Sequence, residues 1–189
     1  MRQTAKRLLA WMIGGLLLVL PAVTHAQDAK LTNIIVTNTR DDLLLYLSVK
    51  GAFPPKIEKT IESGLPAAFS FNINLYRKRV LWPDAKITEI VLTHTIKYDN
   101  LRQEYQVTRS WDNNTAQTVK SFPEAQKLMT EIDSLTIVPL NQLEKGERYQ
   151  IRAKAKLSRL TLPFYLHYVL FFVSLWDFET DWYTIDFIY

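Results

Sequence analysis

The feature that most constrains the fold is the alternation of apolar and polar residues in two long segments of this 189-residue chain. In residues 67–80, the apolar positions are Phe69, Phe71, Ile73 and Leu75, and the polar positions are Ser70, Asn72, Asn74 and Tyr76. Residues 86–98 alternate again after the turn Trp82-Pro83-Asp84. A period of two places each set on one face of a strand. We therefore predict a long antiparallel hairpin with one buried face.

Shorter segments of the same kind predict strands at 31–39, 43–50, 104–111, 135–139 and 148–159. Two other segments predict short helices. The first begins at Pro54-Pro55, buries Ile57 and Ile61, and ends at Gly64. The chain is therefore predicted to be mainly β, an antiparallel sandwich or a strongly curved sheet with two short helices.

The second helix is predicted from a capping box, in which Ser121 is the N-cap and Glu124 follows three residues later. After it come apolar residues at helical spacing, namely Ala125, Leu128, Met129 and Ile132. If the Ser121 hydroxyl accepts a hydrogen bond from the first turn, its removal should cost about 1 kcal/mol of stability.

Residues 1–26 have the pattern of a secretory signal peptide. Arg2, Lys6 and Arg7 precede an uncharged, leucine-rich stretch, and Thr24-His25-Ala26 offers small residues for cleavage. The alternative is an uncleaved signal anchor, although Pro21 favours cleavage. We expect residues 27–189 to be a single β-rich domain in the bacterial periplasm, peripheral to the membrane.

Composition excludes several functions. The leader segment holds three of the 23 basic residues and none of the 19 acidic ones, which leaves 20 against 19 in the rest of the chain. This near-neutral balance argues against a nucleic-acid partner. The chain has no cysteine, which excludes disulfides, thiolate metal sites and cysteine nucleophiles. With only 5 glycines, a glycine-rich phosphate loop is not expected.

The histidines do not suggest catalysis. His94 lies on the apolar face of a predicted strand, where a single histidine is usually a hydrogen-bonded core residue. His167 lies inside an apolar run, and the spacing of the two predicts no zinc site. No Gly-x-Ser-x-Gly nucleophile elbow occurs. We predict no catalytic residues, no metal and no cofactor.

Three acidic residues near the C-terminus, Asp177, Glu179 and Asp181, are spaced by two and would share one face of a strand. Such a row could bind Ca²⁺ or form a glycosidase-like acid pair. The simpler interpretation, which we favour, is a solvated face that discourages pairing with another chain.

Two groups of basic residues are candidates for binding a partner or a lipid headgroup. The first is Arg77-Lys78-Arg79, and the second is the alternating set Arg152, Lys154 and Lys156. If the groups converge, they form a site for an anionic surface or an acidic partner. The simpler interpretation is that they are charged edges of strands.

The most unusual segment is 160–176, which contains no formal charge. Its 17 residues fall short of the ~20 that a membrane-spanning helix needs. Burial in the core, or docking on a membrane or an apolar groove, are the main alternatives. The residues expected to dock are Phe164, Leu166, Leu170, Val173 and Trp176.

A set of landmarks resembles a known family. They are the opening hairpin 31–49, Gly64-Leu65-Pro66, Tyr76-Arg77 before Trp82, Tyr98 before Tyr105, and Asp181-Trp182-Tyr183. Together they resemble the secreted bacterial family catalogued as domain of unknown function 4390. The resemblance implies a small envelope protein with a membrane sensor kinase as one partner, and it transfers no catalytic residue. Family members end in a more polar strand pair than segment 160–176, so the C-terminal topology stays open.

The function predicted from the sequence is a non-enzymatic envelope module that binds a membrane-associated protein or the membrane surface. One alternative is a carrier whose sheet encloses an apolar ligand among Phe69, Phe71, Phe171 and Phe172. A further alternative is a hydrolase that uses Asp177 and Asp181.

Overall fold

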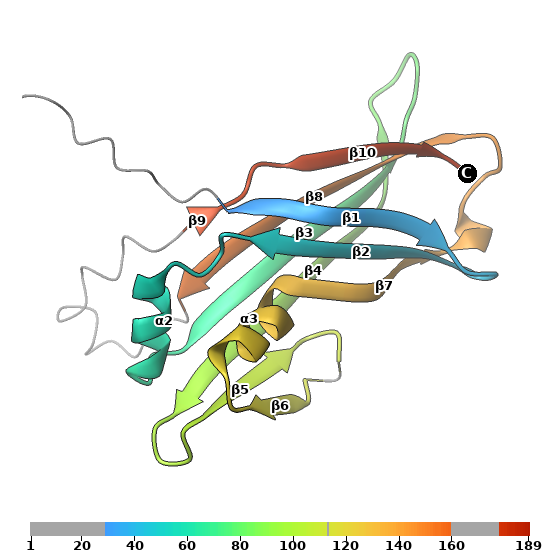
Figure 1. The fold of residues 1–189 in the computed structure, drawn as a ribbon. Helices are drawn as coiled ribbons and strands as arrows, with labels where there is room; N and C mark the ends of the chain where they lie inside the picture. The colour runs from blue at the N-terminus through green and yellow to red at the C-terminus, as the bar shows by residue number, and fades with distance from the viewer. Residues whose placement is uncertain (1–28, 113, 160–177) are drawn as a thin grey trace, which may run out of the picture.

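The computed structural model describes residues 29–112, 114–159 and 178–189, and their fold is mainly β, as the alternation predicted (Figure 1). The strands are β1 (Lys30–Asn38), β2 (Asp42–Lys50), β3 (Ala67–Arg77), β4 (Ala85–Asp99), β5 (Glu104–Arg109), β6 (Ala116–Val119), β7 (Glu131–Pro139), β8 (Arg148–Arg159), β9 (Phe178–Glu179) and β10 (Tyr183–Ile188). The helices are α2 (Pro55–Glu62), α3 (Phe122–Thr130) and the 3₁₀ turn η1 (Leu140–Gln142).

The strands form two antiparallel sheets. The smaller sheet has the order β1-β2-β7, and the larger has the order β10-β8-β3-β4-β5-β6, with β9 paired to β8. Figure 1 shows the smaller sheet lying in front of the larger one, with α2 and α3 at one end of the pair. The predicted class, an antiparallel sandwich or curved sheet with two short helices, is therefore confirmed.

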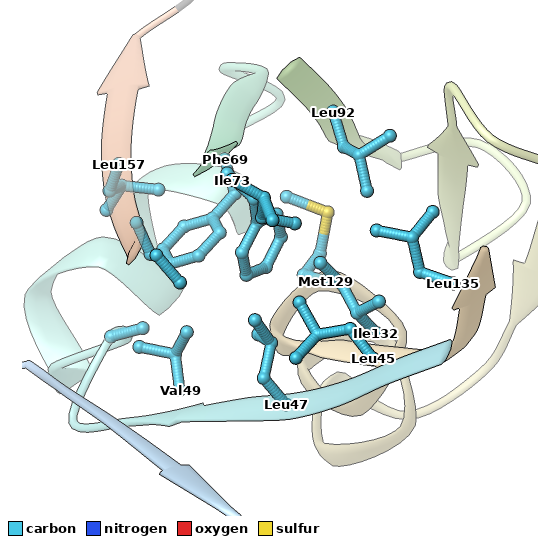
Figure 2. Packing of buried hydrophobic residues seen from close by; sticks show 14 of the residues in the cluster. Leu45, Leu47, Val49, Phe69, Ile73, Leu92, Met129, Ile132, Leu135 and Leu157 are labelled. Carbon is cyan, nitrogen blue, oxygen red and sulfur yellow. The ribbon is translucent and has the colours of Figure 1, made fainter. Parts of the chain in front are cut away.

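Both sheets contribute to one apolar cluster. Leu45, Leu47 and Val49 of β2 point towards Phe69 and Ile73 of β3 and Leu157 of β8 (Figure 2). The apolar set of β3 is entirely inaccessible to solvent. Each buried aliphatic or aromatic side chain of this size contributes about 1.5–3 kcal/mol through removal from water. The alternating sequence thus fixes which face of the large sheet meets the small one.

Helix α2 begins and ends as the sequence predicts. Pro55 occupies its first turn, and Ile57 and Ile61 are the buried residues. The backbone N–H of Gly64 donates to the Ile61 carbonyl, 2.9 Å away. Gly64 has φ of +89°, a left-handed conformation that glycine adopts at little cost.

Helix α3 differs from the sequence prediction in two details, its cap and its last residue. Ser121 is its N-cap, and the Ser121 carbonyl accepts from the Ala125 N–H, but the hydroxyl makes no capping hydrogen bond. The helix also ends at Thr130, so Ile132 lies in β7 instead of the helix. The physical reason is that Glu131 and Ile132 pair with Ser48 and Leu47 of β2. Those cross-strand hydrogen bonds replace another turn of helix.

The remaining differences concern strand ends and one short strand, and β7 begins at Glu131 instead of at the predicted Leu135. β8 has the predicted bounds, whereas β3 stops at Arg77 because Lys78–Asp84 leave the ladder as a protruding loop. The four-residue strand β6 was not predicted, since it is too short to show alternation.

Candidate functional site

The polar positions of the large sheet lie on the face opposite the core. On β3 these are Asn72, Asn74 and Tyr76, and on β8 they are Gln150, Arg152, Lys154 and Lys156. Thr184 and Asp186 of β10 continue the same face, because Thr184 pairs with Arg152 and Asp186 with Gln150. We call this surface the outer face.

One carboxylate joins the two basic groups predicted from the sequence. Asp84 Oδ2 lies 2.8 Å from Lys78 Nζ and 3.4 Å from Arg152 Nη2. The hydrogen bond from Lys78 holds the pKa of Asp84 below its usual value. Lys78 of the first group and Arg152 of the second therefore meet at a shared counter-ion.

Other residues of the two basic groups also have acidic partners. Arg77 pairs with Glu144. Lys154 Nζ lies 2.9 Å from Glu179 Oε1, and this contact lowers the pKa of Glu179. Lys156 is exposed farther along β8. Four of the six basic residues thus have an acidic partner, with Asp84 shared by Lys78 and Arg152, so their positive charge is partly offset.

A cleft of about 520 Å³ opens on the outer face. Its lining residues come from three adjacent strands and the segment before β10: Asn74, Tyr76, Gln150, Arg152, Trp182 and Thr184. Arg152 was predicted from the sequence as a site residue, whereas the other five were not. The available signal was the placement of Asn74 and Tyr76 at polar positions of the strongest alternating segment.

The loop between β3 and β4 carries a second unpredicted feature. Val80, Leu81 and Trp82 are 99%, 88% and 74% exposed, directly after the basic residues Arg77-Lys78-Arg79. Figure 1 shows this hairpin rising beyond the end of the sandwich near the C-terminus. We call Val80-Leu81-Trp82 the hairpin tip. The sequence signal was three apolar residues where a turn is usually polar.

His94 is a structural residue, as its position on the apolar face predicted. It is fully buried, and Trp111 Nε1 donates to its Nε2 at 3.1 Å. Its Nδ1 must therefore carry the proton that is donated to the Met129 carbonyl, 3.0 Å away. Burial lowers the pKa of His94 to about 4, so the ring is neutral at physiological pH. The bond to Met129 joins β4 to α3, and the bond from Trp111 joins β4 to the segment after β5.

The acidic row is interrupted. Glu179 ends β9, and residues 180–182 leave the strand before β10 begins. Thr180 is buried, and its hydroxyl accepts from the Ala155 N–H at 3.0 Å, while Glu179 and Asp181 on either side of it are exposed. Asp177 lies outside the described residues. Within those residues, no group of three or more acidic or histidine side chains is arranged to hold a metal ion.

The predicted apolar docking residues Phe164, Leu166, Leu170, Val173 and Trp176 lie outside the described residues, as does His167. Two of the four residues in the carrier hypothesis, Phe171 and Phe172, also lie outside the described residues. The other two, Phe69 and Phe71, pack against each other in the core with ring centroids 5.0 Å apart. None of the helices in the described part of the chain is both long enough and apolar enough to cross a membrane.

Comparison with known protein families places most of the chain in one of them. A family model described as a domain of unknown function (DUF4390) matches residues 26–186, which is most of the chain. Searches of curated proteins and of solved structures gave no significant match. The chain therefore belongs to the DUF4390 family.

Proposed function

We propose that this protein is a non-enzymatic module of the cell envelope that docks on a membrane surface through its hairpin tip. The observation that carries the proposal is the near-complete exposure of three consecutive apolar residues, Val80, Leu81 and Trp82. Exposed apolar side chains are common singly, but a contiguous group at the end of a protruding hairpin usually marks a contact site. The predicted export signal in residues 1–26 supports an envelope location.

The shape and composition of the tip favour a membrane over a protein partner. Stable protein interfaces cover about 800 Å² on each partner, more than three residues on a loop provide. Apolar residues on a narrow projection can instead enter the boundary between headgroups and acyl chains. Tryptophan is enriched at that boundary, and Trp82 is 74% exposed.

The basic residues beside the tip should make a smaller contribution. Near an anionic membrane, each free Lys or Arg adds about 1 kcal/mol of attraction. Arg77 and Lys78 already pair with Glu144 and Asp84, so part of that attraction is offset. We therefore expect apolar insertion to dominate binding and added salt to weaken it only partly.

The test is sedimentation of the purified protein with phosphatidylcholine vesicles, with and without phosphatidylglycerol, at low and high salt. We expect Leu81→Ser/Trp82→Ser to weaken binding at least about tenfold, because two large side chains lose their burial in lipid. The matched control is Leu101→Ser, since Leu101 is 97% exposed in the turn after β4 and away from the tip. The control should bind as the wild type does.

Two results would overturn the proposal. One is wild-type protein that ignores both kinds of vesicle. The other is equal binding by the tip variant and the control variant. A third experiment places a photo-crosslinking residue at position 81. If the wild type does not bind vesicles and this residue captures an envelope protein, the tip is a protein contact and the membrane proposal is wrong.

A further inference from the structure

The cleft on the outer face is built from two neighbouring rungs of the large sheet. One rung contains Asn74, Arg152 and Thr184 on strands β3, β8 and β10. The next contains Tyr76 and Gln150, with Asp186 beyond them. Trp182 precedes β10 and completes the lining. The cleft volume, about 520 Å³, is within the usual range of sites for small molecules.

The polar groups of the cleft are held in place before any ligand arrives. Arg152 Nε donates to Gln150 Oε1 at 2.6 Å, and Gln150 Nε2 donates to Asp186 Oδ1 at 2.7 Å. The Arg152 guanidinium also lies over the Tyr76 ring, 4.6 Å from its centroid. With Nη2 directed to Asp84, the guanidinium is fixed by three neighbours. Such preorganisation lowers the entropic cost of binding.

Asn74 supplies an unsatisfied group. The residue is 6% exposed, and among the described residues its Oδ1 is buried without a hydrogen-bond partner. Buried polar atoms in folded proteins are nearly always paired, and Asn74 lines the cleft, so its amide is a candidate to form a hydrogen bond with a ligand. Asn74 can both donate and accept, as recognition of a hydroxyl group requires.

Charge balance identifies the class of ligand. Asp84 neutralises Arg152 and Lys78 in part, Glu179 pairs with Lys154, and Asp186 bonds Gln150. The cleft is therefore poorly suited to a phosphate or a carboxylate, which would need uncompensated positive charge. A neutral ligand with several hydroxyl groups suits its amides, its hydroxyl and its anchored guanidinium.

The aromatic residues that line the cleft further restrict the chemical class of the ligand. Trp182 is 49% exposed, with Lys154 Nζ 5.7 Å from the centroid of its ring, and Tyr76 lies under Arg152. Sugar rings present C–H groups that pack on aromatic surfaces and hydroxyls that bond to amides. We infer that the outer-face cleft is a binding site for a neutral saccharide, with Trp182 as the apolar contact and Asn74, Gln150 and Arg152 as the hydroxyl-binding groups.

The test is calorimetric titration of the full-length protein with glucose, N-acetylglucosamine, maltose and chitobiose, and with galacturonate as the anionic probe. We expect at least one neutral sugar to bind with Kd of about 0.1–1 mM, with little dependence on salt. Trp182→Ala should weaken binding at least about tenfold. The matched control is Leu101→Ala, an exposed apolar residue in the turn after β4 and outside the cleft, which should bind as the wild type does.

Asn74→Leu is a second test variant, and it should remain folded, so that a loss of binding can be assigned to the cleft. Removal of the buried orphan amide should leave the melting temperature equal or higher while sugar binding is lost. Lys156→Ala, on the same face of β8, should change neither property. Because the tip variants leave the cleft intact, failure of membrane docking would not affect this result.

Three results would overturn the inference. The first is no heat of binding with any neutral sugar up to about 10 mM, well above the expected Kd. The second is binding that Trp182→Ala and Asn74→Leu leave unchanged, which would place the sugar elsewhere. The third is tighter, salt-sensitive binding of galacturonate, which would make the cleft an anion site.

Discussion

His94 shows how the fold controls the charge of a single residue. In the unfolded chain its pKa is near 6.5, and in the folded protein burial lowers it to about 4. Between these values the unfolded chain takes up a proton that the native protein does not. The contribution of neutral His94 to the free energy of unfolding is therefore fully present above pH 6.5. It is lost as the pH decreases towards 4.

We predict that this effect disappears in His94→Gln. Between pH 6.5 and pH 4, the wild type should lose roughly 3 kcal/mol more stability than the variant, because burial lowers the pKa of His94 from 6.5 to about 4. Urea unfolding across this range measures the difference. The lowered pKa values of Asp84, Asp99 and Glu179 affect both proteins equally. Parallel curves for the two proteins would show that His94 is not the titrating group. At neutral pH the variant should be less stable but still bind vesicles.

Ser121 gives a second prediction at the level of one residue. Its hydroxyl makes no capping hydrogen bond, so Ser121→Ala should change stability by less than about 0.5 kcal/mol. The sequence pattern alone predicted a loss of about 1 kcal/mol. Denaturant midpoints of the two proteins decide between these values. A loss of about 1 kcal/mol at an unchanged slope would mean that the hydroxyl does cap α3 in solution.

At the level of elements, α2 is attached to the larger sheet by a narrow apolar face. Ile57 and Ile61 are its buried residues, and the Tyr105 hydroxyl of β5 donates to Glu62 Oε1 at 3.1 Å. Burial raises the pKa of Tyr105 to about 12, so this hydroxyl keeps its proton across the physiological range. The isolated eight-residue helix would not be stable in water, so its packing holds it in place.

We therefore predict that Ile61→Ala costs about 2–4 kcal/mol, because it leaves a cavity where α2 meets the sheet. Lys59→Ala on the exposed side of the same helix should change stability by less than about 0.5 kcal/mol. Guanidinium unfolding followed by circular dichroism measures both variants. If the two substitutions cost the same, α2 does not contribute its buried face to the core.

At the level of the whole molecule, the two sheets share one apolar cluster. Phe71 lies in the cluster with 0% exposure, and its ring is 5.0 Å from those of Phe69 and His94. Removal of its ring should weaken both sheets together. We predict that Phe71→Ala costs about 3–5 kcal/mol and lowers the unfolding midpoints seen by tryptophan fluorescence and by far-ultraviolet circular dichroism equally. Separate transitions for the two signals would contradict a single cooperative unit.

The sequence by itself determined most of the local structure. Alternation of apolar and polar residues predicted β3, β4 and β8, and Pro55 with Gly64 predicted the limits of α2. It also placed His94 in the core. These features depend on residues close together in the chain, since strand and helix periods and backbone preferences act over a few positions.

The tertiary structure decided what depends on distant residues. Pairing with β2 ended α3 before Ile132, and a shared Asp84 brought Lys78 and Arg152 together. The cleft was beyond sequence reasoning because Asn74, Arg152 and Thr184 become neighbours only when β3, β8 and β10 pair in one register. A shift of one residue would turn each side chain to the opposite face. Alternation tells which side chains share a face, but β8 and β10 are far from β3 in the chain, so their pairing in one register depends on packing of the whole core.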